Sequence, residues 1–413
     1  MDNELIKRLE TLGVRRGLSA KSPRVHLPSP SKRSIEEVLP EGRFWPDHSR
    51  SIFILDHVYP ANFQHGNRSL EMPPEEQVYP GLFNGGLETD HEGLLFLDVE
   101  TSSLSPGSGN LVFLVGLGHW TPEGYHSHQV FLNDPTEEIS FLAYLDNWIN
   151  RFPVLVTFNG QAFDLPVLHH RFLINGLRSE ILKKTHVDIL HFARRLWHKR
   201  YPSRRLAFLE NEVLGFIRGQ DEIPSWMVPE IYQNYLFQGK NDLLPGVFYH
   251  NKMDIVSLAG LFVFIESLFQ QPDWDLFSAD EAYALIREME RHRHERLIRF
   301  LHELIQTPRY SDDPKAAPLW LLIGRIYIRH GWTSEALQCW DKAAGLNSIE
   351  ACLELSQYYE REQRDYSTAL VWLDRAIAIL DTSPSPKEKQ RFGALSRRRL
   401  KLLTQFARRS HAT

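Results

Sequence analysis

A short apolar run that ends in two carboxylates constrains the fold of this chain most strongly. Residues 94–97 (Leu-Leu-Phe-Leu) are followed by Asp98, Val99 and Glu100. The run is short and compatible with extended backbone, so it predicts a buried β-strand. Side chains at positions i and i+2 of a strand leave the same face, so Asp98 and Glu100 point the same way. Such a pair is tolerated where cations neutralise it, and carboxylate oxygens suit Mg²⁺ or Mn²⁺. A solvent-exposed acidic strand end is the alternative at this point.

The composition restricts the class of protein. A length of 413 residues suggests roughly two to three domains, and 42% hydrophobic residues are ample for packed cores. The net charge of −5 excludes binding of nucleic acid through global basicity, so any polyanion site must be a local patch. The two cysteines, Cys339 and Cys352, exclude a disulfide framework and favour a reducing compartment. Without a signal-like apolar core or a run of about 18 apolar residues, we expect a cytoplasmic protein that spans no membrane.

The hydrophobic pattern divides the chain into three parts. Residues 1–50 are expected to form a short N-terminal helix and a Pro/Ser-rich extended segment. Residues 51–270 predict a mixed α/β sheet, in which a three-strand antiparallel meander is followed by parallel strands alternating with helices. Residues 279–413 predict an all-helical domain that begins with one long charged helix over 279–306.

The expected elements of the α/β part follow from alternating apolar runs and helical spacing. Strands are predicted at 51–60, 94–98, 111–120, 126–133, 154–158 and around 187. Helices are predicted at 136–150, 163–175, 189–198, 205–214, 227–237 and 246–269.

Further candidate carboxylates lie at the start of one predicted helix and inside another. The chain leaves the strand at 154–158 through Asn159 and Gly160, which places Asp164 at the beginning of a helix. The positive end of the helix dipole would by itself favour an Asp there. His250 and Asp254 are four residues apart on a helix and therefore share a face. A solvent-facing His–Asp pair is the alternative.

Together, Asp98, Glu100, Asp164 and Asp254 provide four carboxylates at or near the ends of elements around one sheet. Four converging acids would hold two divalent cations about 3.5–4 Å apart. His250 would then lie where it can take a proton from an attacking water. The sequence therefore predicts a metal-dependent site that hydrolyses phosphodiesters.

The segments that carry these residues resemble a known family. FLDVET, NGQAFD and HNKMD are similar to the three exonuclease motifs of the DEDD superfamily. HVDILHFARRLW and LAFLENEVLG are similar to its bacterial YprB-like branch, in which an exonuclease domain precedes helical repeats. The resemblance covers roughly residues 51–269. It implies a ribonuclease-H-like fold and 3′–5′ exonucleolytic hydrolysis with two Mg²⁺ or Mn²⁺, held by the four carboxylates named above.

One departure from the superfamily pattern concerns the general base. The tyrosine class of the superfamily has Tyr four residues before the last Asp, and the histidine class has His five residues before it. In this chain His250 is four residues before Asp254 and Tyr249 is five before it. Only one of the two faces the ligands in a given helical register, and we favour His250 because positions i and i+4 share a face. A catalytically weak or inactive nucleic-acid-binding adaptor is therefore the alternative function.

The densest basic segment, RRLWHKRYPSRR over residues 194–205, is the candidate surface for single-stranded RNA or DNA. Its cations would meet phosphates and its aromatic rings would stack on unpaired bases. A solvated helix end is the alternative, because cations are favoured at helix C-termini. The residues assigned to this surface are Arg194, Arg195, Trp197, Lys199, Arg200, Tyr201, Arg204 and Arg205.

A repeat follows in the helical part. Trp320, Gly324 and Tyr327 match the W-x₂-L-G-x₂-Y pattern of tetratricopeptide repeats, and a weaker copy includes Leu355 and Tyr359. About three repeats are needed to bury a continuous core, so flanking helices are expected to cap the array. Such repeats usually bind peptide segments, and here they would recruit a protein partner or pack on the first domain.

Overall fold

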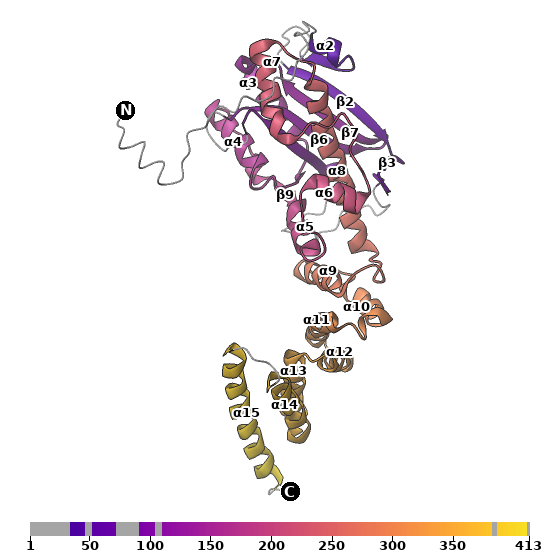
Figure 1. Cartoon of the computed structure of the whole chain (residues 1–413), viewed down its shortest axis with the longest axis vertical. Coiled ribbons are helices and arrows are strands. Elements are labelled where there is room, and N and C mark those ends of the chain that lie inside the picture. The colour runs from indigo at the N-terminus through magenta and orange to yellow at the C-terminus, as the bar shows by residue number, and fades with distance from the viewer. Residues whose placement is uncertain (1–33, 46–51, 72–90, 104–109, 382–385, 411–413) are drawn as a thin grey trace, which may run out of the picture.

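The computed structural model describes residues 34–45, 52–71, 91–103, 110–381 and 386–410. A sheet flanked by helices forms one end of the molecule, and an array of helices extends away from it to the C-terminus (Figure 1). The N-terminal helix and extended segment predicted before residue 34 lie outside the described residues.

Seven strands form the main sheet, in the order β1-β2-β7-β6-β5-β8-β9. Their bounds are β1 (Arg43–Trp45), β2 (Ile52–Pro60), β5 (Leu94–Thr101), β6 (Val112–Thr121), β7 (Gly124–Leu132), β8 (Val154–Thr157) and β9 (Thr185–Asp188). β5 is antiparallel to β6 and parallel to β8, so it lies where the antiparallel and parallel parts of the sheet meet. The prediction of a mixed sheet with helices is confirmed. The edge strand β1 lies before residue 51, where the sequence placed the start of this domain, because three residues are too few to show a strand period.

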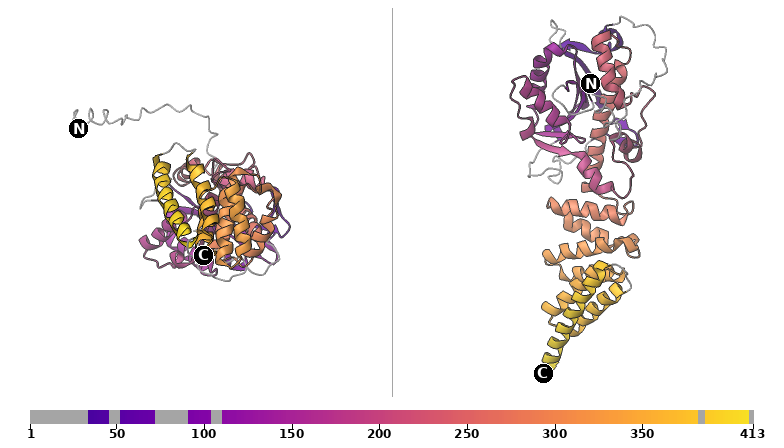
Figure 2. Two further views of the ribbon diagram at one scale, coloured as in Figure 1. Left: turned by 90° about the horizontal axis from the view of Figure 1, so that it is seen from below. Right: turned by 60° about the vertical axis from the view of Figure 1, so that its left-hand side comes forward.

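Helices cover both faces of the sheet. Their bounds are α2 (Ile35–Val38), α3 (Glu138–Ile149), α4 (Asp164–Ile174), α5 (Ile189–Trp197), α6 (Leu206–Leu209), α7 (Val228–Gln238) and α8 (Leu244–Gln270). The side view in Figure 2 shows α3 and α4 on one side of the sheet and the long helix α8 on the other. The helix predicted over 205–214 is instead the short α6 followed by a π-helical turn over Glu210–Leu214.

α8 is the one helix among the described residues that is long and apolar enough to cross a membrane. Its most apolar window is 78% buried inside the protein. Ile255 and Phe262 belong to the hydrophobic core between α8 and the sheet. Packing against the sheet therefore explains why α8 is so apolar.

Two glycines of β6 let α8 approach the sheet closely. A Cβ atom at Gly116 would lie 2.6 Å from Asn251 Oδ1 and 2.7 Å from Ile255 Cγ1. At Gly118 it would lie 2.7 Å from Ile255 Cγ2. Gly116 pairs with Asp98 of β5, so the close approach brings side chains of α8 next to the acidic end of β5.

Gly116→Ala is expected to lower the free energy of unfolding by about 1–3 kcal/mol, because the added methyl group forces α8 away from β6. Gly345→Ala is the matched control, since a Cβ atom there meets nothing within 4 Å. Chemical denaturation measures both variants. Equal unfolding free energies for the two variants would contradict the tight α8–β6 contact.

The C-terminal part consists of helices, and from residue 317 onward each helix packs on the next one along the chain. Their bounds are α9 (Ala279–Arg291), α10 (Leu297–Ile305), α11 (Ala317–Arg329), α12 (Thr333–Gly345), α13 (Ile349–Arg361), α14 (Tyr366–Asp381) and α15 (Pro386–Ser410). The prediction of one helix over 279–306 is wrong. The chain turns between α9 and α10, where Arg293 has a φ of 54°, a value that ends an α-helix.

Candidate functional site

The acidic end of β5 meets the N-terminal half of α8. Asp98 Oδ2 accepts a hydrogen bond of 2.9 Å from Asn251 Nδ2. His250 Nε2 lies 3.8 Å from Glu100 Oε1 and 3.5 Å from Asp254 Oδ2. One ligand atom from each of Glu100, His250 and Asp254 lies within 4.8 Å of the other two. The fold therefore brings residues of β5 and α8 that are 150 or more positions apart in sequence into one cluster.

Asp164 joins this cluster from the other side of β5. It is the first residue of α4 and is buried. Its carboxylate accepts a hydrogen bond from the backbone N–H of Val99, the residue between Asp98 and Glu100. Asp98 and Asp164 lie outside the closest group of three ligand atoms, but their charges act on each other and on Glu100.

Asp188 fixes the turn that delivers Asp164. Its carboxylate accepts from the backbone N–H groups of Asn159 (2.8 Å) and Gln161 (3.2 Å). It also caps α5 by accepting from the N–H of Leu190 at 3.1 Å. Asn159 has a φ of 70°, a conformation that such side-chain support helps to hold. Asp188 is thus a helix cap that also positions the candidate site.

The carboxylates are in an environment that disfavours their charge. Burial, followed by the charges of Asp254 and Asp164, raises the pKa of both Asp98 and Glu100 well above the usual range. Burial and the charge of Asp188 raise the pKa of Asp164 to about 7. A divalent cation would remove this mutual repulsion, and a set of carboxylate oxygens is the donor set that Mg²⁺ and Mn²⁺ prefer. The residues present therefore fit such an ion.

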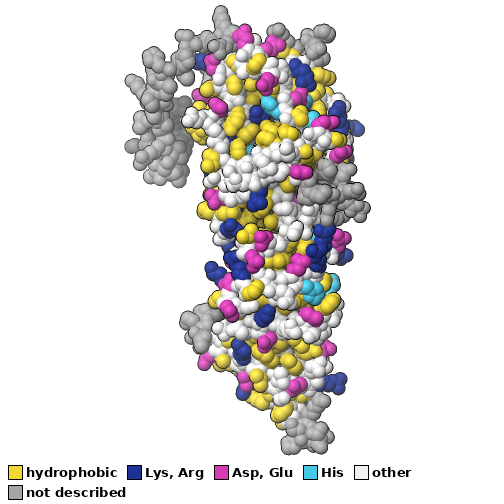
Figure 3. All heavy atoms as spheres, turned by 90° about the vertical axis from the view of Figure 1, so that its right-hand side faces the viewer, with side chains coloured by type: hydrophobic (Ala, Val, Ile, Leu, Met, Phe, Trp, Pro, Cys, Tyr) yellow, Lys and Arg dark blue, Asp and Glu magenta, His cyan; other side chains and the backbone are white. Residues whose placement is uncertain are grey.

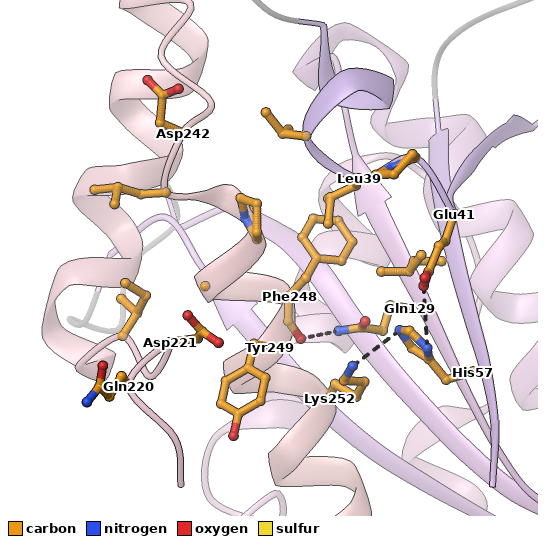
Figure 4. A pocket seen from close by; sticks show the side chains of 17 residues that line it. Leu39, Glu41, His57, Gln129, Gln220, Asp221, Asp242, Phe248, Tyr249 and Lys252 are labelled. Atoms are coloured by element: carbon orange, nitrogen blue, oxygen red, sulfur yellow. Dashed lines mark hydrogen bonds and ion pairs between the residues drawn. The ribbon is translucent and has the colours of Figure 1, made fainter. Parts of the chain in front are cut away.

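The register of α8 separates His250 from Tyr249. His250 faces the carboxylates, and its Nδ1 lies 2.6 Å from Glu222 Oε1. Burial alone would lower the pKa of His250, but the hydrogen bond to Glu222 and the charge of Asp254 raise it overall. Tyr249 instead lines a separate cavity together with His57 and Lys252 (Figure 4). Its hydroxyl accepts from the N–H of Gly219 at 3.1 Å, away from the carboxylate cluster.

Arg218 is a site residue that the sequence reasoning missed. Its guanidinium contacts Asp254 directly and also pairs with Glu210. The residue lies in the irregular segment after the π-helical turn, where no periodic pattern is present. Gly215 and Gly219 flank this segment and indicate a turn or loop here, which is the only sequence signal near Arg218.

The basic segment 194–205 separates into two groups. Arg194, Arg204 and Arg205 line an open cavity together with His250 and Asp254. On the face of the molecule in Figure 3, Lys/Arg and Asp/Glu side chains are interspersed. The three arginines beside the carboxylates are thus a local cationic rim.

The other cations of this segment bind α9. Arg195 pairs with Glu288 at 2.8 Å, Lys199 with Asp280 at 2.5 Å and Arg200 with Glu281 at 2.9 Å. These ion pairs connect the end of α5 to the helical part of the chain. The structure therefore gives these three residues partners in α9, and their contact with phosphate stays a prediction.

The aromatic residues of the segment are packed inward. Trp197 is 4% exposed and stacks on Phe264, so it presents no face to a nucleic-acid base. Tyr201 is partly buried and packs edge-on against Phe208. The predicted stacking role of Trp197 is contradicted, because its position on the apolar face of α5 places it in the core.

Comparison with known proteins supports the fold and the family. Residues 95–265 match a family model described as the RNase_H superfamily. The uncharacterized protein YprB of Bacillus subtilis (strain 168) is 30% identical over 360 residues, which cover 82% of this chain and 84% of that protein. The chain belongs to the YprB family. The matched range of this YprB-family chain contains Asp98, Glu100, Asp164, His250 and Asp254.

The match of residues 95–265 to the RNase_H superfamily indicates an RNase H-like fold and suggests a nuclease-type activity on nucleic acids. Among solved structures, the family B DNA polymerase from the hyperthermophilic archaeon Pyrobaculum calidifontis is similar to part of this chain. The similarity covers 48% of this chain and 29% of the polymerase chain. The identity is 16% and the TM-score is 0.33.

Proposed function

We propose that this YprB-family chain is a two-metal-dependent 3′–5′ exonuclease that hydrolyses phosphodiester bonds at single-stranded nucleic-acid ends. The observation that supports this most strongly is the meeting of Glu100, His250 and Asp254 within 4.8 Å beside Asp98 and Asp164. The DEDD-like pattern of these residues within a range that matches the RNase_H superfamily is the second support.

Asp98, Glu100, Asp164 and Asp254 are the residues proposed to hold two divalent cations, Mg²⁺ or Mn²⁺. When bound, such ions neutralise negative charge that develops on a phosphodiester and make a water molecule more acidic. The four carboxylates contribute oxygen ligands at the end of β5 and at the start of α4 and within α8. The raised pKa values of Asp98, Glu100 and Asp164 mark a cluster whose negative charge a bound cation would stabilise.

His250 is the proposed general base. Its Nδ1 lies 2.6 Å from the carboxylate of Glu222, which favours an N–H at Nδ1 and leaves the Nε2 lone pair toward the site. Nε2 lies 3.2 Å from Ser225 Oγ and within 4 Å of Glu100 and Asp254. A histidine held in this way can accept the proton of an attacking water.

Arg194 and Arg205 are proposed to bind the phosphates of the strand. Both are exposed on the rim of the cavity that His250 and Asp254 line. Replacing both with Ala is expected to weaken strand binding and to lower the slope of log K against log salt by about 1 per lost phosphate contact. Fluorescence anisotropy at several salt concentrations measures this, with Arg325→Ala as a remote control that pairs with Glu354. Unchanged affinity and salt slope in the double variant would remove these arginines from the strand path.

A comparison of linear and circular strands tests the exonuclease proposal. Labelled single-stranded RNA and DNA are prepared with a free 3′ end or as closed circles, and each is incubated with the protein and Mn²⁺ or Mg²⁺. We expect progressive shortening of linear strands and intact circles. Cleavage of circles would indicate an endonuclease. Binding of both forms without cleavage in any divalent metal would favour the inactive adaptor.

The helical part is proposed to form tetratricopeptide-like repeats that bind a protein segment. The residues of the repeat pattern lie at the contact between α11 and α12, where a Cβ atom at Gly324 would lie 2.4 Å from Trp340 Nε1. Trp320 and Tyr327 are fully buried in the same core. This packing is what the small and large positions of the pattern require.

We also propose that the protein works in a reducing, cytoplasmic environment. Cys339 and Cys352 are buried free thiols. Burial raises the pKa of Cys339 to about 12 and that of Cys352 to about 11. Thiols of this kind act as small apolar core residues rather than as disulfide partners.

A further inference from the structure

Arg218 has contacts that set it apart from the other arginines around the candidate site. Its side chain is only 8% exposed, although it lies in an irregular segment between the π-helical turn and α7. Two of its guanidinium nitrogens bind Glu210, with Nε 2.7 Å from Oε2 and Nη2 2.6 Å from Oε1. Glu210 is itself 1% exposed. This two-point contact fixes the plane of the guanidinium.

The remaining donors of Arg218 reach the proposed catalytic groups. Nη2 donates to Asp254 Oδ1, and Nη1 donates to Glu222 Oε1 at 2.9 Å. Nη1 also lies 3.2 Å from His250 Nδ1. The same Oε1 of Glu222 lies 2.6 Å from His250 Nδ1. One guanidinium thus contacts a proposed metal ligand and the carboxylate that orients the proposed base.

A count of hydrogen-bond donors separates Arg218 from the phosphate-binding arginines. A guanidinium has five N–H donors and no acceptor. Four of them donate to oxygens of Glu210, Glu222 and Asp254, and the fifth lies against the imidazole of His250. At most one donor is therefore left for a phosphate oxygen. Arg218 therefore acts on its neighbours and leaves the strand to Arg194 and Arg205.

We propose that Arg218 is a positioning residue of the nuclease site, which fixes Asp254 directly and His250 through Glu222. This inference rests on the nuclease function proposed above. Asp254 Oδ1 is held by Arg218, so its Oδ2 is the oxygen turned toward His250 Nε2, 3.5 Å away. The cluster is thereby arranged for metal ligation before any ion binds.

Two effects of Arg218 on metal binding have opposite signs. Its positive charge repels a cation, so charge alone predicts that metal binds more tightly once Arg218 is removed. Orientation predicts the reverse, because loss of a group that holds a metal ligand typically lowers metal affinity about 10- to 100-fold. The buried carboxylate of Glu210 already compensates the charge of Arg218, so we expect orientation to dominate.

Calorimetric titration with Mn²⁺ tests this inference on the full chain. Arg218→Met alone would leave Glu210 buried without its cation, so Arg218→Met/Glu210→Gln is the main variant. Arg218→Lys keeps the charge but not the planar fork. Arg325→Met, in the helical part, is the control for loss of an arginine. Thermal unfolding establishes that each variant is folded.

We expect both Arg218 variants to bind Mn²⁺ about 10- to 100-fold more weakly than wild type. Turnover of a labelled strand should show a lower kcat with an unchanged KM for the strand, since the phosphate contacts remain. Unchanged or tighter Mn²⁺ binding in either folded variant would overturn the positioning role, as would a raised KM with normal kcat. If the wild type neither binds Mn²⁺ nor shortens a strand, the proposed function fails and this inference fails with it.

Discussion

Asp98→Ala is expected to lower the rate of Mn²⁺- or Mg²⁺-dependent strand shortening by more than about 100-fold, since removal of a ligand must cost at least as much as removal of a group that orients one. Asp98 belongs to the carboxylate cluster, and its carboxylate interacts with the charges of Asp254, Asp164 and Glu100. Its loss leaves the proposed cations without their ligand from the middle of β5. The rate is measured on a labelled single strand under single-turnover conditions.

Glu92→Gln is the matched control for this variant. Glu92 is an exposed carboxylate two residues before β5, so its replacement removes the same charge outside the cluster. The control should retain the wild-type rate, and both variants should unfold at similar temperatures. Metal-dependent shortening that persists in Asp98→Ala would show that the activity comes from another site.

Arg171→Met is expected to destabilise the protein by about 3–5 kcal/mol, because it leaves a buried carboxylate without its cation. Arg171 of α4 and Glu138 of α3 form a paired contact at 2.5 Å and 2.6 Å, with side chains only 11% and 9% exposed. Since α4 begins at Asp164, the same pair holds the helix that delivers one proposed ligand. Chemical denaturation measures the change in unfolding free energy.

The double variant Arg171→Met/Glu138→Leu separates the loss of the ion pair from the loss of packing. Replacement of both partners with apolar side chains of similar size is often nearly neutral, so most of the stability should return. If the double variant is as unstable as Arg171→Met, the uncompensated charge of Glu138 is not the cause.

The proposed ligands were predictable because each belongs to a local pattern. Asp98 and Glu100 follow from an apolar run with two acids on one face, and Asp164 follows from a strand that ends in Asn-Gly. His250 and Asp254 follow from helical spacing. Each pattern spans fewer than ten residues, so the face on which its side chains lie can be predicted from the local sequence. The fold then brings the patterns together around one sheet.

Arg218 was not predictable in the same way. Its partners Glu210 and Asp254 are 8 and 36 positions away, and the chain around it forms neither helix nor strand. No periodicity constrains the direction of a side chain in such a segment. Only the packing of the turn after α6 against α8 brings its guanidinium to the carboxylates.

Two predictions were wrong because they were based on charged residues: the single helix over 279–306 and the stacking role of Trp197. The segment around Arg293 is rich in Glu, His and Arg and contains no Gly or Pro, so it favoured one continuous helix, whereas a residue with positive φ divides it. In the basic segment, Trp197 was grouped with its charged neighbours. Its spacing from Ala193 and Leu196 is that of the apolar face of α5, and that spacing decided its burial.

The most direct test of the proposed function is one 5′-labelled linear strand, as RNA and as DNA, incubated with the wild-type full chain and Mn²⁺ and then with excess chelator. The carboxylate cluster at the end of β5 predicts a ladder of successively shorter labelled products that stops growing once the metal is removed. A strand that is bound but keeps its full length in both Mn²⁺ and Mg²⁺, or one that shortens equally in chelator, would contradict a metal-dependent 3′–5′ exonuclease.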